Sequence, residues 1–244
     1  MWPFGYFTRK RRQKVRRRPF PRAWADILRA NLPFYERLSE AERAELHGHV
    51  QVFLDEKQFQ GYRGLEITDE VRLTIAGQAC LLVLGGPGDY FKHLRSIHVY
   101  PGEAYTGRQP RRDGPAVVDS PQARLGESWY RGPVVLSWDA VRRGAADPRD
   151  GRNVVLHEFA HQLDGEATGM DGAPRLRAWG MYAAWARVLG REYKELVEKV
   201  AEHRPAVLDE YAATAPPEFF AVVTEAFFEK ARALRRKHPE LYEQ

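Results

Sequence analysis

The residues best suited to chemistry in this sequence are His157, Glu158 and His161, which form the pattern H-E-x-x-H. On a helix, residues four apart lie on one face, so both imidazoles can bind a single metal ion. Glu158 lies about 100° around the helix from His157, beside such an ion, where it can take a proton from a water molecule. The pattern predicts a zinc hydrolase site with Glu158 as its base.

The segment that carries this pattern has the spacing of an amphipathic helix, and Asn153 is of a type that caps helix N-termini well. The apolar residues share one face, roughly opposite the two histidines: Leu156, Phe159, Ala160 and Leu163. One side of the helix can therefore pack on a core while the other presents the metal ligands. Asp164 follows His161 on the same side and is predicted to orient a histidine from outside the ligand set.

A tetrahedral zinc ion that keeps one position for water needs a third protein ligand. The only cysteine, Cys80, lies in a different predicted helix, so we expect a carboxylate or histidine further along the chain. Pro216-Pro217 favours a helix start, which places Glu218 in the first turn and Glu225 two turns later on the same face. On spacing alone the two glutamates are close competitors, because Glu218 also suits the positive end of a helix without any metal.

The composition is that of an ordinary folded protein, with 43% hydrophobic and 29% charged residues in a chain of 244. A single cysteine excludes an internal disulfide and every zinc or iron–sulfur site built from several cysteines. The longest apolar stretch, residues 79–84, is far shorter than the ~18–20 residues that span a bilayer. With one thiol and no secretory signal after the first basic residues, the predicted location is the cytoplasm.

Basic residues are concentrated near the N-terminus. Residues 9–18 hold eight Lys or Arg and no acidic residue, which leaves 30 basic against 33 acidic residues in the rest of the chain. We expect residues 1–22 to form a disordered basic arm and residues 23–244 to form one domain. Weak contact of residues 9–18 with nucleic acid or anionic lipid is the alternative, although no recognition fold accompanies this segment.

Helical periodicity dominates the chain. Ser39 and Glu42 match a capping box that opens a helix, and the apolar spacing from Val71 to Val83 predicts another. From residue 139 onward the pattern is helical almost to the end. The clearest segments lie near residues 152–164, 176–203 and 216–236.

A few short strands complete the predicted fold. They are expected at residues 96–100 and 133–138, whereas residues 102–126 are expected to be mostly loop with a short strand at 116–118. A small mixed sheet with a helix-rich C-terminal half corresponds to an α+β fold. Residues 134–138 form either an exposed edge strand that aligns an extended peptide or a buried, fully paired strand.

In its motifs the sequence resembles the Mlc titration factor family, a group of bacterial zinc metallopeptidases. The zinc-binding half is also similar to the catalytic domain of anthrax lethal factor, in which a tyrosine and a glutamate follow the histidine motif with the same spacing. The matching segments are ordered and spread over most of residues 24–244: Gly126-Glu-Ser-Trp129, Gly132-Pro-Val-Val-Leu-Ser-Trp138, His157-Glu-Phe-Ala-His-Gln-Leu-Asp164, Asp209-Glu-Tyr-Ala-Ala213 and Glu218-Phe-Phe-Ala-Val222.

The resemblance implies a zincin fold that binds one Zn²⁺ ion. By position, the implied ligands are His157, His161 and Glu218, and Glu225 is left as a residue that supports the ligands from outside. Glu158 becomes the general base. Tyr211 becomes the residue that faces the scissile carbonyl and donates a hydrogen bond to the oxyanion. Ala215 departs from the pattern, since a helix cap such as Asn or Asp is expected there.

Two classes of function follow from the resemblance. The first is a cytoplasmic zinc peptidase acting on a peptide substrate, with aminopeptidase as the narrower expectation. The second is a regulatory binding protein, because the family is named for sequestering the glucose repressor Mlc. In that case the partner would be a transcriptional repressor of the Mlc type, and zinc would be mainly structural.

Overall fold

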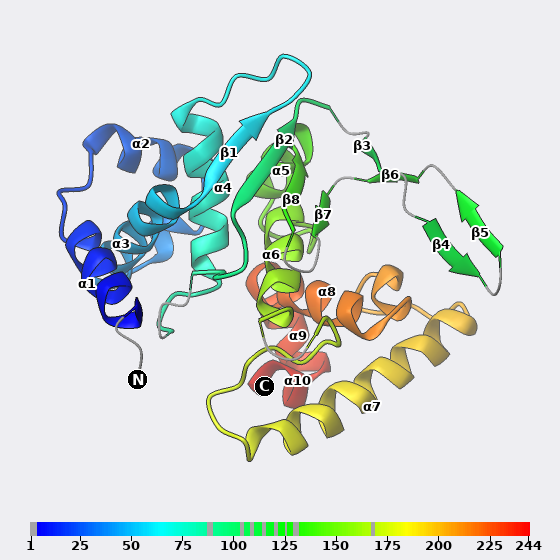
Figure 1. Cartoon of the computed structure of the whole chain (residues 1–244). Coiled ribbons are helices and arrows are strands. Elements are labelled where there is room, and N and C mark those ends of the chain that lie inside the picture. The colour runs from blue at the N-terminus through cyan, green and yellow to red at the C-terminus, as the bar shows by residue number, and fades with distance from the viewer. Residues whose placement is uncertain are drawn as a thin grey trace.

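A computed structural model describes residues 4–86, 90–102, 105–107, 110–113, 116–119, 122–124, 126–128, 132–166 and 169–244. A small sheet stands among the helices of the N-terminal half, and the helices from residue 181 onward gather below it in the view of Figure 1. The predicted α+β class with a helix-rich C-terminal half is confirmed. No helix in the described residues is long and apolar enough to cross a membrane.

The sheet has the strand order β1-β2-β8-β7 and is mixed. Strands β1 (Gln58–Gly61), β2 (Ser96–Tyr100) and β8 (Val134–Ser137) run parallel, while β7 (Gly126–Ser128) runs antiparallel to β8. All four residues of β8 are buried, and the strand pairs on both sides. The buried, paired interpretation of residues 134–138 therefore holds, and the exposed-edge interpretation is wrong. Pairing ends at Ser137, whose side chain accepts the backbone N–H of Ala140 and caps the next helix.

The short strand expected at residues 116–118 is confirmed, whereas the expectation that residues 102–126 are otherwise mostly loop is wrong for the described residues. They form two antiparallel pairs that extend away from the sheet in Figure 1. Antiparallel pairing uses backbone groups alone, which a Gly-, Pro- and Arg-rich composition does not reveal. The paired strands are β3 (Tyr105–Gly107) with β6 (Gln122–Arg124), and β4 (Pro110–Asp113) with β5 (Ala116–Asp119).

Three helices follow the N-terminal segment: α2 (Arg22–Asn31), α3 (Glu40–Glu56) and α4 (Asp69–Leu81). The capping box of α3 is confirmed. The Ser39 hydroxyl accepts the backbone N–H of Glu42 at 3.3 Å, and the Ser39 backbone N–H donates to the Glu42 carboxylate at 2.8 Å. Both groups would otherwise be orphaned at the helix end.

The expectation of a disordered N-terminal arm is wrong for the described residues, because Phe4–Arg16 form helix α1. The helix lies on α3, where Arg11 pairs with Asp55 at 2.6 Å and Arg12 with Glu56 at 2.8 Å. Val15 is 2% exposed and packs in a small cluster with Val52 and Tyr90. A row of arginines thus folds because acidic residues at the end of α3 neutralise part of its charge.

The C-terminal half consists of helices, as the pattern predicts. The helical pattern at 216–236 is divided in two at Lys230, whose φ of −116° and ψ of 29° lie outside the helical region. The helices are α5 (Trp138–Ala146), α6 (Val154–Asp164), α7 (Met181–Ala201), the 3₁₀ helix η2 (Glu210–Ala213), α8 (Pro216–Glu229), α9 (Ala231–Lys237) and α10 (Pro239–Glu243).

Helix α6 lies between two hydrophobic clusters. Phe159 belongs to the cluster of the sheet and the N-terminal helices, where its ring centroid lies 5.7 Å from Phe53 and 4.8 Å from Phe91. Ala160 belongs to the cluster formed by α7, α8 and the last helices. Packing on both sides fixes the helix, so the residues on its remaining face are held rigidly.

Candidate metal centre

The start of α6 is fixed by Asn153. Its side-chain oxygen accepts the backbone N–H groups of Val155 and Leu156, each at 3.1 Å, which confirms the predicted N-cap. Helix α5 approaches this point closely at Gly144, where an added Cβ would stand 3.0 Å from the Cα of Asn153. The tight approach holds the first turn of α6, which carries His157, against α5.

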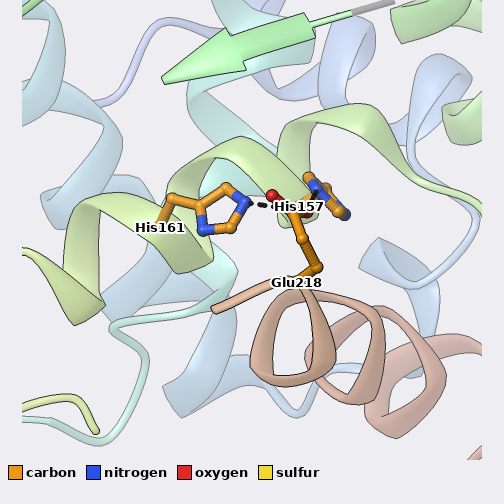
Figure 2. A group of neighbouring side chains, drawn as sticks. All are labelled: His157, His161 and Glu218. Carbon is orange, nitrogen blue, oxygen red and sulfur yellow. Dashed lines mark hydrogen bonds and ion pairs between the residues drawn. The ribbon is translucent and has the colours of Figure 1, made fainter. Parts of the chain in front are cut away.

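Two helices bring three potential ligands together (Figure 2). His157 and His161 come from α6 and Glu218 from the first turn of α8. One ligand atom of each lies within 4.8 Å of the other two. The Glu218 Oε2 atom lies 3.0 Å from the Nε2 atom of His157 and 3.3 Å from that of His161. Glu218, and not Glu225, thus meets both histidines.

The donor set fits a zinc ion. Zinc binds imidazole nitrogen and carboxylate oxygen at ~2.0–2.2 Å in a tetrahedron, whose corners then lie roughly 3.3–3.5 Å apart. The 3.3 Å between His161 and Glu218 matches that spacing, and the 3.0 Å between His157 and Glu218 needs only a small opening. The carboxylate supplies one negative charge and the two imidazoles are neutral donors. This set suits a divalent cation.

Glu225 lies behind His157. Its Oε1 atom accepts a hydrogen bond from Nδ1 of His157 at 2.8 Å, and its Oε2 atom accepts the backbone N–H of Asn153. A proton held on Nδ1 leaves the Nε2 lone pair directed at the metal position. Burial would lower the pKa of His157, but the contacts with Glu218 and Glu225 outweigh it and raise that pKa well above its ordinary value in the protein without metal.

Glu158 is 5% exposed and stands among the charged groups of the site. Burial raises the pKa of its carboxyl to about 7, although His157 and His161 act in the opposite direction. A carboxyl with a pKa near neutrality can accept a proton and release it again at ordinary pH.

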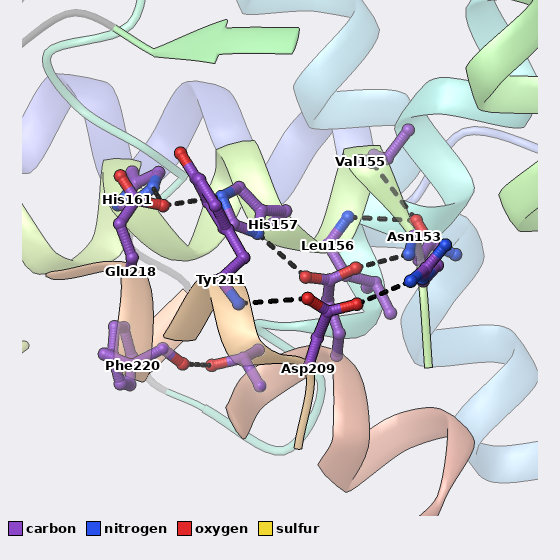
Figure 3. A network of polar contacts seen from close by, with 12 residues as sticks. Asn153, Val155, Leu156, His157, His161, Asp209, Tyr211, Glu218 and Phe220 are labelled. Carbon is purple, nitrogen blue, oxygen red and sulfur yellow. Dashed lines mark hydrogen bonds and ion pairs between the residues drawn. The ribbon is translucent and has the colours of Figure 1, made fainter. Parts of the chain in front are cut away.

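Tyr211 lies on η2, and its ring centroid is 6.0 Å from that of His157. The side chain is half-exposed, so a bound molecule can reach it. Asp209 sets the position of the turn, because one carboxylate oxygen accepts the backbone N–H of Tyr211 at 3.0 Å (Figure 3). The other oxygen accepts a guanidinium N–H of Arg152 at 2.7 Å, which links η2 to the segment just before α6.

The predicted contact of Asp164 with a histidine is wrong within the described residues. Its two oxygens instead accept the backbone N–H groups of Gly172 and Ala173, at 2.8 and 2.9 Å. Among the described residues, none is hydrogen-bonded to the Nδ1 atom of His161. Gly172 has a φ of +81°, and an added Cβ would lie 2.8 Å from the carbonyl oxygen of Pro216, at the start of α8. Asp164 therefore holds a loop against the helix end that carries Glu218.

Sequence reasoning missed the polar network that supports these residues. The Asn153 side-chain amide donates to Gln78 at 2.8 Å and to Glu229 at 3.0 Å. Burial raises the pKa of Glu229 to about 7, against the hydrogen bond from Asn153. Glu229 was detectable, since it lies one turn after Glu225 on the same face of α8. Gln78, 75 residues before Asn153, left no such signal.

The structure does not reach every segment of the resemblance. Trp129, the last residue of the first matching segment, lies outside the described residues, and of that segment only the β7 backbone is described. The other four segments fall on β8, α6, η2 and α8, the elements that surround the candidate site or lead into it.

Comparison with known proteins agrees with the motifs. The family model described as glucose-regulated metallo-peptidase M90 matches residues 6–244. The protein slr2042 of Synechocystis sp. is 41% identical over all of this chain and 89% of its own length. Proteins named Mlc titration factor A are 32% identical in Serratia proteamaculans, over 90% of this chain and 83% of theirs, and 31% in Pectobacterium atrosepticum, over 87% and 80%. These matches confirm the resemblance to the Mlc titration factor family.

Proposed function

The chain belongs to the glucose-regulated metallo-peptidase M90 family, and on that premise we propose that it is a zinc-dependent peptidase. The observation that carries the proposal is the meeting of His157, His161 and Glu218 from two helices. We propose these three as the ligands of one Zn²⁺ ion, within one peptidase domain formed by residues 23–244, on which α1 packs. A zinc ion supplies Lewis acidity, which acidifies a water molecule and polarises a peptide carbonyl.

Glu158 is proposed as the general base. It takes a proton from the attacking water as the water oxygen bonds to the carbonyl carbon, and then passes the proton to the leaving amine nitrogen as the C–N bond breaks. Its buried position next to His157, on the helix that carries both histidines, supports this role.

Tyr211 is proposed to donate its hydroxyl hydrogen to the oxyanion that develops on the carbonyl oxygen. Its placement beside His157 and its half-exposed side chain support that role. Such a donor strengthens as charge builds on the oxygen, and therefore stabilises the transition state more than the bound peptide. Glu225 is proposed to orient His157, to which it is hydrogen-bonded.

The test is Glu158→Gln in the zinc-loaded chain, assayed on short chromogenic peptides alongside its zinc content. We expect one zinc ion per chain to remain and cleavage to fall roughly 10²- to 10⁴-fold. The matched control is Glu198→Gln on α7, an exposed glutamate outside the site, which should cleave at the parent rate. A Glu158→Gln chain that cleaves like the parent would reject the proposed base.

Aminopeptidase action is the narrower proposal. Peptides with a free α-amino group and the same peptides N-acetylated separate the two modes. An aminopeptidase cleaves only the free form, whereas an endopeptidase cleaves both.

A second candidate function rests on the names of the relatives, which are called Mlc titration factors. Under this alternative the chain binds a transcriptional repressor of the Mlc type and the metal serves structure. The Glu158→Gln variant lets the two functions be measured separately. Peptide cleavage depends on Glu158 and is lost in the variant, whereas repressor binding does not depend on it and persists. If parent and variant bind a repressor and neither cleaves any peptide, the binding function replaces the peptidase.

A further inference from the structure

The outward face of helix α1 is basic and aromatic. At 100° per residue, six of its exposed side chains fall within about 160° of the helix circumference. They are Tyr6, Phe7, Arg9, Lys10, Lys14 and Arg17, the last directly after the helix end. The buried Val15 and the paired Arg12 lie on the opposite side, against α3. Docking of α1 thus leaves one face directed at solvent.

This face keeps its charge. Arg11, Arg12 and Arg18 are paired with Asp55 or Glu56 at the end of α3. Within the described part of the chain, Arg9, Lys14 and Arg17 make no such ion pair, and Lys10 lies over the ring of Tyr6 at 4.6 Å. Outside residues 9–18 the chain has fewer basic than acidic residues. The face is therefore a positive pole on a slightly acidic body, which orients the molecule toward an anionic surface.

The same face exposes two large apolar rings. Tyr6 is 57% and Phe7 65% exposed, and their rings contact each other edge to face, with centroids 5.9 Å apart. Aromatic rings favour the interface between lipid headgroups and acyl chains, and neighbouring Lys and Arg side chains favour anionic headgroups. A helix face that carries both kinds of side chain therefore suits the headgroup layer of an anionic membrane.

From these observations we propose that α1 docks the protein flat on an anionic lipid bilayer. Nucleic acid fits this face less well. Bases stack on open ring faces, whereas the Lys10 ammonium lies over Tyr6 and the edge of one ring meets the other. The proposal does not depend on peptidase activity.

The test is co-sedimentation of the full chain with vesicles of phosphatidylcholine alone or with about one-third phosphatidylserine. We expect binding only to the anionic vesicles, weakening as salt is raised. Each Lys or Arg near such a surface strengthens binding roughly fivefold, so Lys14→Gln/Arg17→Gln should weaken it roughly 25-fold. The matched control is Arg187→Gln/Lys194→Gln, two exposed cations on α7 with the same loss of net charge, which should bind like the parent.

The aromatic rings are tested by Tyr6→Ser/Phe7→Ser, which should weaken vesicle binding without moving the thermal midpoint, since both side chains are exposed. If either variant unfolds, Arg9→Gln/Lys10→Gln on the same face replaces it. Equal binding to both vesicle types, or an equal loss in the α7 control, overturns the proposal. Tighter retention on duplex DNA than on anionic vesicles, unaffected by the aromatic variant, would assign the face to nucleic acid instead.

Discussion

The Oε1 atom of Glu225 lies 2.8 Å from the Nδ1 atom of His157, on the side of the ring away from the candidate metal position. Glu225 also accepts the backbone N–H of Asn153, the residue that caps the helix carrying His157. One buried carboxylate thus fixes both the histidine ring and the start of its helix. Support of this kind commonly decides how tightly a metal is bound.

For Glu225→Ala we expect zinc to remain bound but roughly 10- to 100-fold more weakly, because His157 loses the partner that fixes its ring and tautomer. Competition with a chromogenic chelator measures the affinity. Glu198→Gln, an exposed glutamate on α7, is the control and should bind zinc like the parent. Unchanged affinity in Glu225→Ala would contradict the role of this contact.

For Glu218→Ala we expect the loss of stoichiometric zinc, since this carboxylate is the only group from α8 that meets both histidines among the described residues. Zinc at 100 times its dissociation constant should stabilise the parent by about 2.7 kcal/mol. The variant should show no zinc-dependent rise in its thermal midpoint. Full zinc occupancy in Glu218→Ala together with loss in Glu225→Ala would reverse the assignment.

For Asp209→Ala we expect kcat to fall roughly 10- to 100-fold at unchanged zinc content, because Tyr211 loses the carboxylate that holds its turn. Asp209→Asn keeps an oxygen for the Tyr211 N–H and should restore most of the rate. A variant that merely weakened the fold would lower zinc content and rate together. Zinc analysis beside steady-state kinetics, with kcat and KM separated, distinguishes these results.

For Gly172→Ala we expect a loss of stability of more than about 1 kcal/mol and weaker zinc binding. The residue combines a positive φ with close approach to the carbonyl oxygen of Pro216, two residues before Glu218. Gly64→Ala is the matched control, since Gly64 has a φ of +83° and nothing lies within 4 Å of an added Cβ. Chemical denaturation and chelator competition on both variants separate the free-energy cost of a side chain at positive φ from the effect of displacing α8. Equal effects in the two variants would show that contact with Pro216 is immaterial.

For Glu229→Gln we expect a gain in stability that depends on pH. Burial raises the folded-state pKa of Glu229 from 4.5 to about 7, so between these values the folded chain holds a proton that the unfolded chain has lost. The contribution of Glu229 to the free energy of unfolding therefore falls as the pH rises from 4.5 to about 7. The variant should match the parent near pH 4 and exceed it by on the order of 2–3 kcal/mol above pH 7. Denaturation of the metal-free proteins across this range measures the difference, and a constant difference would contradict the shift.

Much of the site followed from local pattern. The histidine pair, the cap at Asn153 and the buried face through Phe159 are all set within one helix, where a spacing of 3.6 residues decides which side chains share a face. The capping box at Ser39 is local in the same sense, and the structure confirms it. Contacts between distant segments were predicted less well. Asp164 suggested a partner for a histidine by its spacing, yet it binds the backbone of a loop eight residues away.

The sequence by itself determined that His157 and His161 stand together on one helix with Glu158 beside them, because those positions depend only on helical geometry. It also placed Glu218 and Glu225 on one face of a second helix. Only the tertiary structure decided that Glu218 lies against the Nε2 atoms of both histidines while Glu225 is hydrogen-bonded to Nδ1 of His157. This arrangement depends on how α6 packs on α8, and His157 and Glu218 are 61 residues apart in the chain. The tertiary structure also decided that the basic N-terminus folds. The acids that neutralise Arg11 and Arg12 are Asp55 and Glu56, each 44 residues further along the chain, and no local pattern reveals them.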